Sequence, residues 1–272
     1  MLVFKNSKVR NLNPARLSMP ELIVKGTQIH FWERKGTSIF PVLFIHGSGG
    51  NANIWKRVVD ELAEFHSIFV DLPGHGKSGG EGKRSIPEYS GFINDFCEAL
   101  GLGKFVLGGH SLGGGIALEY AIRKPENLKA ILLIGTGARL RVLPAALDYL
   151  KKMADGEIPA KFEPWAFSDK ASSEVLAEGE REWAETSPKV RYYDMLACDQ
   201  FDVTGDVARI VSSALIVCGR EDRLTPIKYS EFLKNRIPES KMEVIDGAAH
   251  MLMLENPKAL GLAISNFLGS LN

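Results

Sequence analysis

The chain has 272 residues, with 33 basic and 33 acidic side chains, 45% hydrophobic and 24% charged residues, and no net charge. These values are ordinary for a globular protein that can bury one sizeable core. Because the chain has no basic cluster, we expect no binding to nucleic acid or to an anionic membrane surface.

Segments that would direct the chain to a membrane or out of the cell are not found in the sequence. No apolar run is long enough to span a bilayer, and residues 1–20 lack the apolar core of a secretion signal. The three cysteines, at 97, 198 and 218, are too few and too scattered for a disulfide framework or a zinc site. We therefore expect a cytoplasmic protein without a membrane span.

Strands and helices are predicted to alternate along most of the chain. Residues 1–20 are interpreted as a loosely held extension, and 21–25 with 28–33 as a hairpin of two strands at a sheet edge. Short apolar runs predict further strands at 41–46, 67–72, 105–107, 129–134, 214–218 and 241–245. Apolar residues at helical spacing predict helices at 53–65, 85–100, around 116–121, 226–237 and 256–268. This order indicates one sheet of mostly parallel strands with helices on both faces, an α/β fold.

The alternation is interrupted once, after the strand at 129–134. Residues 138–199 contain no clean strand and are rich in Trp, Tyr, Phe and Met, with helical patches. We interpret 138–200 as a mostly helical lid inserted into a core formed by 21–137 and 201–272.

A Gly-x-Ser-x-Gly motif, residues 109–113, lies between the strand at 105–107 and the helix that follows. A strand that turns directly into a helix forces its central residue into a strained conformation, and the small glycines leave room for the turn. The turn would expose the hydroxyl of Ser111 near the helix N-terminus, as a nucleophile requires. The alternative interpretation is a serine that merely caps the helix.

A serine nucleophile needs a base, and the base needs an orienting acid. His250 follows the last predicted strand, at the carboxyl edge where ligands bind in open α/β sheets. Asp222 follows the strand at 214–218 and precedes Pro226, which favours it as the acid; Glu221 is its nearest rival. More distant rivals are Asp199, Asp202 and Asp206, and the remaining histidines are His30, His46, His66, His75 and His110.

The glycine loop at 47–50 follows a buried strand and allows the backbone to approach a substrate closely. We expect the amides of Ser48 and Leu112 to form an oxyanion hole. A phosphate-binding loop is the competing interpretation, but the segment lacks both G-x-G-x-x-G and a P-loop lysine.

Five motifs in the same chain order resemble the α/β-hydrolase superfamily, in its short, soluble, lidded branch. They are residues 46–50, 71–78, the Ser111 motif, 219–226, and His250 followed by 255–257. The resemblance implies an eight-stranded sheet with a lid between the sixth and seventh strands. It also implies Ser111 as nucleophile, His250 as general base and then acid, and Asp222 as orienting acid.

The resemblance also narrows the chemistry. A serine nucleophile argues against haloalkane dehalogenases and epoxide hydrolases, which use an aspartate, and Met251 stands where C–C bond hydrolases often carry tryptophan. We expect a carboxylesterase that hydrolyses small or medium acyl esters through an acyl-enzyme, with no metal or cofactor, as a monomer or homodimer. Rival functions are a lactonase, thioesterase, C–C hydrolase or amidase on the same triad, and a ligand receptor with slow turnover.

Residues of the lid and of the facing loops are expected to determine the substrate. The candidates for substrate binding are Gly47, Trp55, Leu140, Leu143, Trp165, Met195 and Met251. The alternative is that most of them pack the lid onto the sheet. Arg123, Arg139 and Arg141 are kept open as anchors for an anionic substrate.

Overall fold

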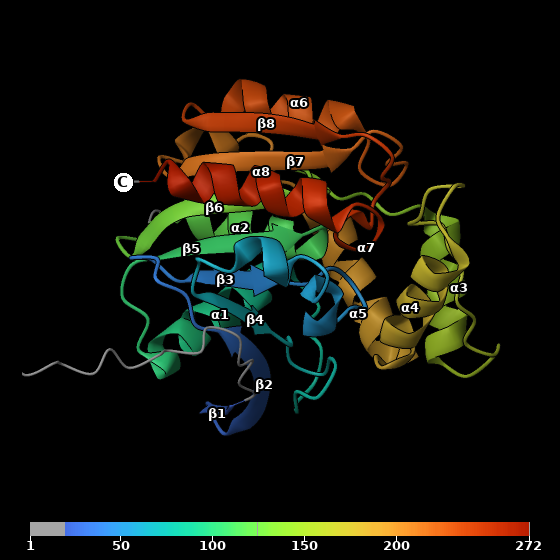
Figure 1. The fold of residues 1–272 in the computed structure, drawn as a ribbon. Helices are drawn as coiled ribbons and strands as arrows, with labels where there is room; N and C mark the ends of the chain where they lie inside the picture. The colour runs from blue at the N-terminus through green and yellow to red at the C-terminus, as the bar shows by residue number, and fades with distance from the viewer. Residues whose placement is uncertain (1–19, 124, 272) are drawn as a thin grey trace, which may run out of the picture.

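The computed structural model describes residues 20–123 and 125–271. A single eight-stranded sheet in the order β1-β2-β4-β3-β5-β6-β7-β8 forms its centre (Figure 1). The strands are β1 (Glu21–Val24), β2 (Thr27–Arg34), β3 (Val42–Ile45), β4 (Ser67–Val70), β5 (Phe105–His110), β6 (Leu128–Ile134), β7 (Ser213–Gly219) and β8 (Ser240–Ile245). The β1–β2 and β2–β4 pairs are antiparallel, and all other pairs are parallel. The predicted α/β fold with a mostly parallel eight-stranded sheet is confirmed.

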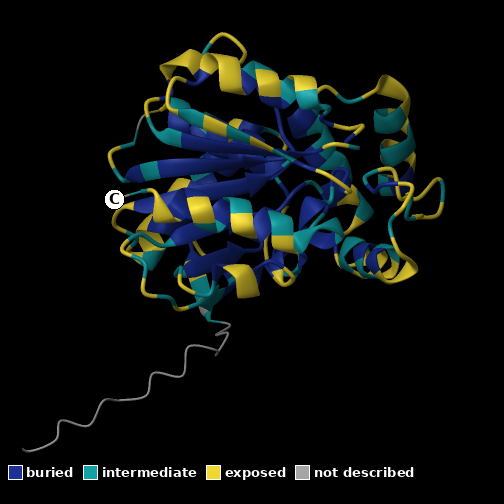
Figure 2. Cartoon of the chain, turned by 45° about the horizontal axis from the view of Figure 1, so that its top comes forward, coloured by how far each residue is buried: buried dark blue, intermediate teal, exposed yellow. Residues whose placement is uncertain are grey.

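Helices cover both faces of this sheet. The α-helices of the described residues are α1 (Ile86–Leu100), α2 (Leu112–Ile122), α3 (Pro144–Ala154), α4 (Ser173–Ala184), α5 (Pro188–Gln200), α6 (Ile227–Arg236), α7 (Leu252–Glu255) and α8 (Pro257–Gly269). Those that cover the sheet are α1, α2, α6, α7 and α8. Successive residues of β3 point to opposite faces of the sheet and belong to different apolar clusters. Leu43 belongs to the cluster that includes residues of α1, α2 and α6, and Phe44 to the cluster that includes residues of α7 and α8. Because the central strands are covered on both sides, they are buried along their length (Figure 2).

The single helix predicted at 53–65 is wrong. Two short 3-10 helices are found instead, Ala52–Trp55 and Val59–Leu62. The predicted apolar residues are buried, as at Ile54, Val58 and Leu62, so the spacing identified the inward face correctly. The adjacent β-branched Val58 and Val59 slightly lower the helix propensity of this segment, and its packing against β4 and α8 favours two short 3-10 helices over one α-helix.

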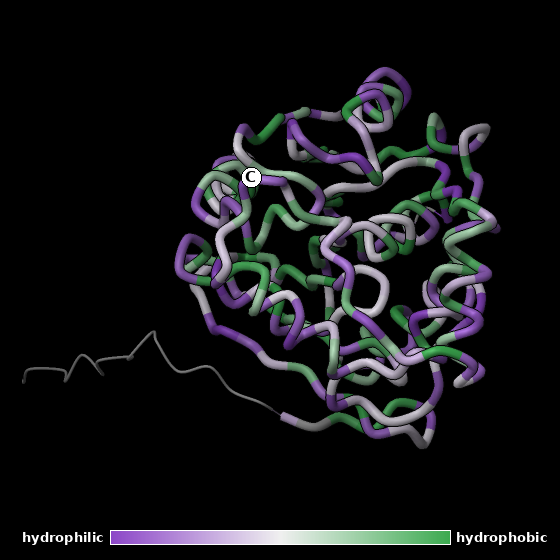
Figure 3. Tube along the Cα trace, turned by 90° about the vertical axis from the view of Figure 1, so that its right-hand side faces the viewer, coloured by the Kyte–Doolittle hydropathy of each residue, from purple (hydrophilic) through white to green (hydrophobic). Residues whose placement is uncertain are grey.

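Three helices, α3, α4 and α5, lie between β6 and β7 in the chain and together stand beyond one end of the sheet (Figure 1). Figure 3 views the molecule from that end. We call residues 138–200 the helical insertion. Its action as a lid, and the division of the chain into domains, stay predictions; the extension predicted at 1–20 lies outside the described residues except for Pro20. Within the described part of the chain, no helix has the length and apolarity that a membrane span requires.

Candidate active site

Ser111 lies at the junction of β5 and α2 with a positive φ of 53° and ψ of −113°, a conformation that non-glycine residues rarely adopt. Hydrogen bonds hold this conformation: the Ser111 amide donates to the Ile134 carbonyl (2.9 Å), and the Thr136 hydroxyl donates to the Ser111 carbonyl (2.8 Å). Among the described residues, the Ser111 side chain makes no capping bond to α2. The capping alternative is therefore not what the structure shows, and the strain is of the kind that persists at functional sites.

The two glycines of the motif are required by close backbone approach. A Cβ atom on Gly109 would lie 2.1 Å from the backbone carbon of Gly113, and one on Gly113 would lie 2.6 Å from the carbonyl oxygen of Ile45. Backbone atoms cannot move aside as flexible side chains do. The turn that exposes Ser111 is thus possible only with glycine at both positions.

Asp222 and His250 meet across the loops that follow β7 and β8. Asp222 Oδ2 lies 2.9 Å from His250 Nδ1 and accepts the Thr225 hydroxyl at 2.7 Å. Asp222 Oδ1 accepts the amides of Leu224 (2.8 Å) and Thr225 (2.9 Å). Both Asp222 and His250 are buried. Sequence reasoning did not assign a role to Thr225, although its position three residues after the aspartate is the available signal.

The carboxylate of Asp222 is ionised. Burial alone would raise its pKa, but the charge and hydrogen bond of His250, with the donors from Thr225, hold the pKa well below its usual range. An ionised acceptor at Nδ1 fixes the His250 tautomer with the proton on Nδ1. The other ring nitrogen, Nε2, is then left as a proton acceptor, as a general base requires.

His110 connects the Ser111 turn to the His250 loop. Its Nε2 donates to the His250 carbonyl at 2.9 Å, and the two ring centroids are 4.6 Å apart. Burial and the neighbouring His250 lower the pKa of His110 well below its usual value, so its ring is neutral. Because His110 directly precedes Ser111, the predicted nucleophile and base lie at the same edge of the sheet.

The glycine loop after β3 lies against this turn. A Cβ on Gly47 would be 2.6 Å from His110 Nδ1 and 3.3 Å from Ser111 Cβ. Gly49 has φ +65°, and the Gly50 amide closes the turn onto the Gly47 carbonyl at 3.1 Å. The loop that carries the Ser48 amide is therefore adjacent to the Ser111 side chain.

The helical insertion also contacts the His250 loop. The amides of His250 and Met251 donate to the Ala166 carbonyl, at 3.0 and 3.2 Å. The Glu255 carboxylate accepts hydrogen bonds from the amide of Ala249, in the His250 loop (3.0 Å), and from the amide of Ser168, in the insertion (2.7 Å). Residues 166–168 thus fasten the insertion to the segment that carries the predicted base.

The residues predicted to bind substrate lie in different environments. Trp55 and Leu140 are buried in the two apolar clusters, which agrees with the packing alternative. Leu143 and Trp165 are 75% and 54% exposed on the insertion. Met195 and Met251 are half-buried, and Gly47 lies in the loop described above. Their role in binding substrate stays a prediction.

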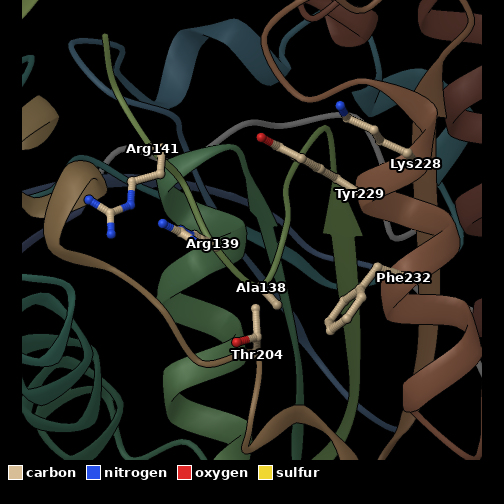
Figure 4. A pocket seen from close by; sticks show the side chains of 7 residues that line it. All are labelled: Ala138, Arg139, Arg141, Thr204, Lys228, Tyr229 and Phe232. Carbon is tan, nitrogen blue, oxygen red and sulfur yellow. The ribbon is translucent and has the colours of Figure 1, made fainter. Parts of the chain in front are cut away.

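A surface cavity of about 360 Å³ lies beside the segment after β6 and the start of α6 (Figure 4). Its walls are Ala138, Arg139, Arg141, Thr204, Lys228, Tyr229 and Phe232. Arg139 and Arg141, kept open as anchors for an anionic substrate, therefore line this cavity, whereas the residues predicted for catalysis do not. Arg123 is elsewhere, paired with Glu119 on α2 at 2.8 Å. Over 20–123 and 125–271, no group of three or more His, Cys, Asp or Glu side chains could hold a metal ion.

Comparison with known proteins gives a consistent result. The model of the alpha/beta hydrolase family matches residues 42–261. A thermophilic esterase structure superposes with a TM-score of 0.79 at 34% identity, over 94% of this chain and 99% of that one. A malate-bound esterase from Thermogutta terrifontis gives a TM-score of 0.80 at 25% identity, over 93% and 99% of the two chains. A putative carbamate hydrolase, RutD of Azorhizobium caulinodans, is 27% identical over 85% of this chain and 92% of its own length.

Proposed function

Because the chain belongs to the alpha/beta hydrolase family, we propose that it is a serine carboxylesterase that cleaves esters of small to medium acyl size. The observation that carries this proposal is the strained Ser111 at the strand–helix junction, with its hydroxyl free of the helix cap. The esterase structures at 25% and 34% identity support an ester as the scissile group.

In the proposed mechanism, His250 Nε2 accepts the hydroxyl proton of Ser111 as the serine oxygen attacks the ester carbonyl. The amides of Ser48 and Leu112 donate to the oxyanion of the tetrahedral intermediate. The imidazolium then protonates the leaving alcohol, which leaves an acyl group on Ser111. Water, deprotonated by His250, attacks the acyl carbonyl; the bond to the Ser111 oxygen then breaks, His250 returns the proton to that oxygen, and the acid is released. Asp222 holds the imidazole in the required tautomer and stabilises its positive charge.

A panel of p-nitrophenyl esters of increasing acyl length tests the proposal. We expect Ser111→Ala to lower kcat by about 10⁴- to 10⁶-fold, the range found when a triad nucleophile is removed. Ser90→Ala is the matched control, since the Ser90 hydroxyl is buried in α1 with no hydrogen-bond partner among the described residues. Its removal should leave kcat unchanged. Labelling by a phosphonate ester should add one group to the wild type and none to Ser111→Ala.

Other outcomes would replace the esterase with one of its rivals. Faster turnover of a lactone, thioester, amide or carbamate, still lost in Ser111→Ala, would keep the triad and change the substrate class. Tight ligand binding with a raised Tm and negligible turnover would identify a receptor. Esterase activity that survives in Ser111→Ala would refute the proposed nucleophile.

A further inference from the structure

A carboxylate from the helical insertion is buried beneath the proposed oxyanion loop. Asp194, on α5, is fully buried, and its Oδ2 accepts the Gly49 amide at 2.7 Å and lies 2.8 Å from His75 Nε2. Its Oδ1 accepts the Tyr89 hydroxyl at 2.6 Å. One side chain therefore joins the insertion to the loop at 47–50, to the turn that follows β4, and to α1.

Asp194 and His75 form a buried ion pair. His75 Nδ1 faces the Pro73 carbonyl at 3.1 Å, so with Asp194 at Nε2 both ring nitrogens act as donors. Burial would lower the pKa of His75, but the Asp194 carboxylate outweighs it and the pKa is raised. Burial would raise the pKa of Asp194, but His75, Tyr89 and the Gly49 amide lower it.

Stability alone is a weak reason for such a pair. The cost of removing two charges from water roughly cancels their attraction, and apolar side chains of similar size often stabilise a core as well. A buried ion pair that fixes a particular geometry is better explained by what that geometry does. Here the carboxylate meets a backbone amide of the loop next to Ser111.

The bond to Gly49 determines how that loop is presented. The Gly49 amide belongs to the peptide unit that follows Ser48, so the bond to Asp194 fixes the plane of that unit. Only the φ and ψ angles of Ser48 separate this plane from the Ser48 amide, so fixing it restricts the directions in which the Ser48 amide can point. Other residues of the insertion also contact this loop. A Cβ on Gly49 would lie 2.6 Å from Arg191 Cγ, and the Thr186 hydroxyl donates to the Gly50 carbonyl at 3.3 Å. An oxyanion donor is effective only when it is held in place before charge develops.

We propose that Asp194 is a positioning residue that holds the Gly49 amide and thereby aims the Ser48 amide at the oxyanion, so that the insertion completes the catalytic centre. The effect on turnover rests on the proposed function, whereas the anchoring of the loop does not. Two readouts therefore test the proposal: kcat and KM for a p-nitrophenyl ester, and the hydrogen-exchange rate of the Gly49 amide measured by NMR on the full chain.

Asp194→Ala should free the Gly49 amide. We expect its exchange to accelerate at least about tenfold, and kcat to fall at least about tenfold with KM within about threefold, because an oxyanion donor acts on the transition state. Asp194→Asn keeps a neutral acceptor and should recover part of both losses. Tyr89→Phe is the matched control: it removes a bond to the other carboxylate oxygen, so Gly49 exchange and kcat should stay within about threefold of wild type.

Each outcome decides the proposal. A folded Asp194→Ala with wild-type Gly49 exchange and wild-type kcat overturns it, as does a loss that appears only in KM. If Asp194→Ala does not fold, Asp194→Asn decides: values equal to those of Tyr89→Phe overturn the proposal, and faster Gly49 exchange with lower kcat supports it. Absence of Ser111-dependent turnover in the wild type overturns the proposed function and the catalytic effect of Asp194 together, while Gly49 exchange still decides whether Asp194 anchors the loop.

Discussion

Replacing Asp222 with asparagine tests the proposed triad directly, because the structure fixes which way the new amide faces. Asp222 Oδ1 accepts two backbone amides, from Leu224 and Thr225, and neither can turn away. The amide oxygen of asparagine must take this place. Its NH₂ group then points at His250 Nδ1, where Oδ2 now lies 2.9 Å away. A donor at Nδ1 places the ring proton on Nε2, so that His250 can no longer accept the proton of Ser111.

The expected magnitude follows from the loss of the base. The wrong tautomer should lower kcat by about 10⁴-fold, equivalent to about 5.5 kcal/mol of transition-state stabilisation. Stability should change less, because both backbone bonds remain and the Thr225 hydroxyl can turn to accept from the new NH₂. The lowered pKa of Asp222 stabilises the folded state above about pH 4 and this contribution is lost as the pH falls, so the stability cost of Asp222→Asn should shrink in acid.

Steady-state hydrolysis of a p-nitrophenyl ester, with urea unfolding of each variant, measures both effects. Glu221→Gln is the matched control, since Glu221 is the adjacent carboxylate but bonds to the Ser168 hydroxyl. We expect its kcat within about threefold of wild type. A folded Asp222→Asn that keeps more than about a tenth of the activity would refute the reasoning and move the acid role to another carboxylate.

Three further predictions concern stability and reactivity. Gly109→Ala should unfold the protein or lower the free energy of unfolding by more than about 3 kcal/mol, because the new Cβ overlaps backbone atoms. Gly91→Ala, in α1 with open space around it, should raise the free energy of unfolding by about 0.5–1 kcal/mol. Equal urea midpoints for the two variants would contradict this. Burial, then the neighbouring His75, lower the pKa of His46 to about 4, and burial, then His250, lower the pKa of His110 well below its usual value. The unfolded chain therefore binds more protons than the folded one below about pH 6.5. As the pH falls from about 6 to 4, the free energy of unfolding should therefore decrease by up to about 1.4 kcal/mol per pH unit for each of these two rings. His75, whose pKa is raised, contributes a constant amount over this range. A free energy of unfolding that does not change with pH in urea melts would refute this. All three cysteines are buried with raised pKa values, so Ellman's reagent should label them only on unfolding, and rapid labelling of the native protein would contradict the packing.

Sequence alone could predict the parts of this molecule that depend on local pattern. The buried strands, the turn at Ser111, and the loops of Asp222 and His250 each combine an apolar run with characteristic turn residues, and parallel strands bring their ends to one edge. Asp194 could not be found this way. In sequence it is one of two acidic residues of α5, and nothing in the sequence distinguishes it from Asp199. Its burial arises only when α5 packs over a loop 145 positions earlier in the chain.

The same limit explains the other differences. Helical spacing at 53–65 indicates which side chains face inward. Whether the backbone forms α-helical or 3-10 hydrogen bonds depends also on how the segment packs against the sheet and α8. The exposure of Leu143 and Trp165 likewise follows from tertiary placement. Apolar character in the insertion does not distinguish a wall of a pocket from an outer surface.

The insertion is attached to the rest of the molecule at 166–168 and at 186–194. We expect residues in these attached parts to tolerate fewer substitutions than the remainder of the insertion. Substitutions in the attached parts should disturb the loops that carry the proposed catalytic residues, so we expect them to lower kcat for every ester tested. Residues 143–165 lie between β6 and the first of these anchors, and within α3 Met153 is the one buried residue. We expect that this span can be exchanged with that of a relative, and that such an exchange would change substrate selectivity more than the rate of the reaction.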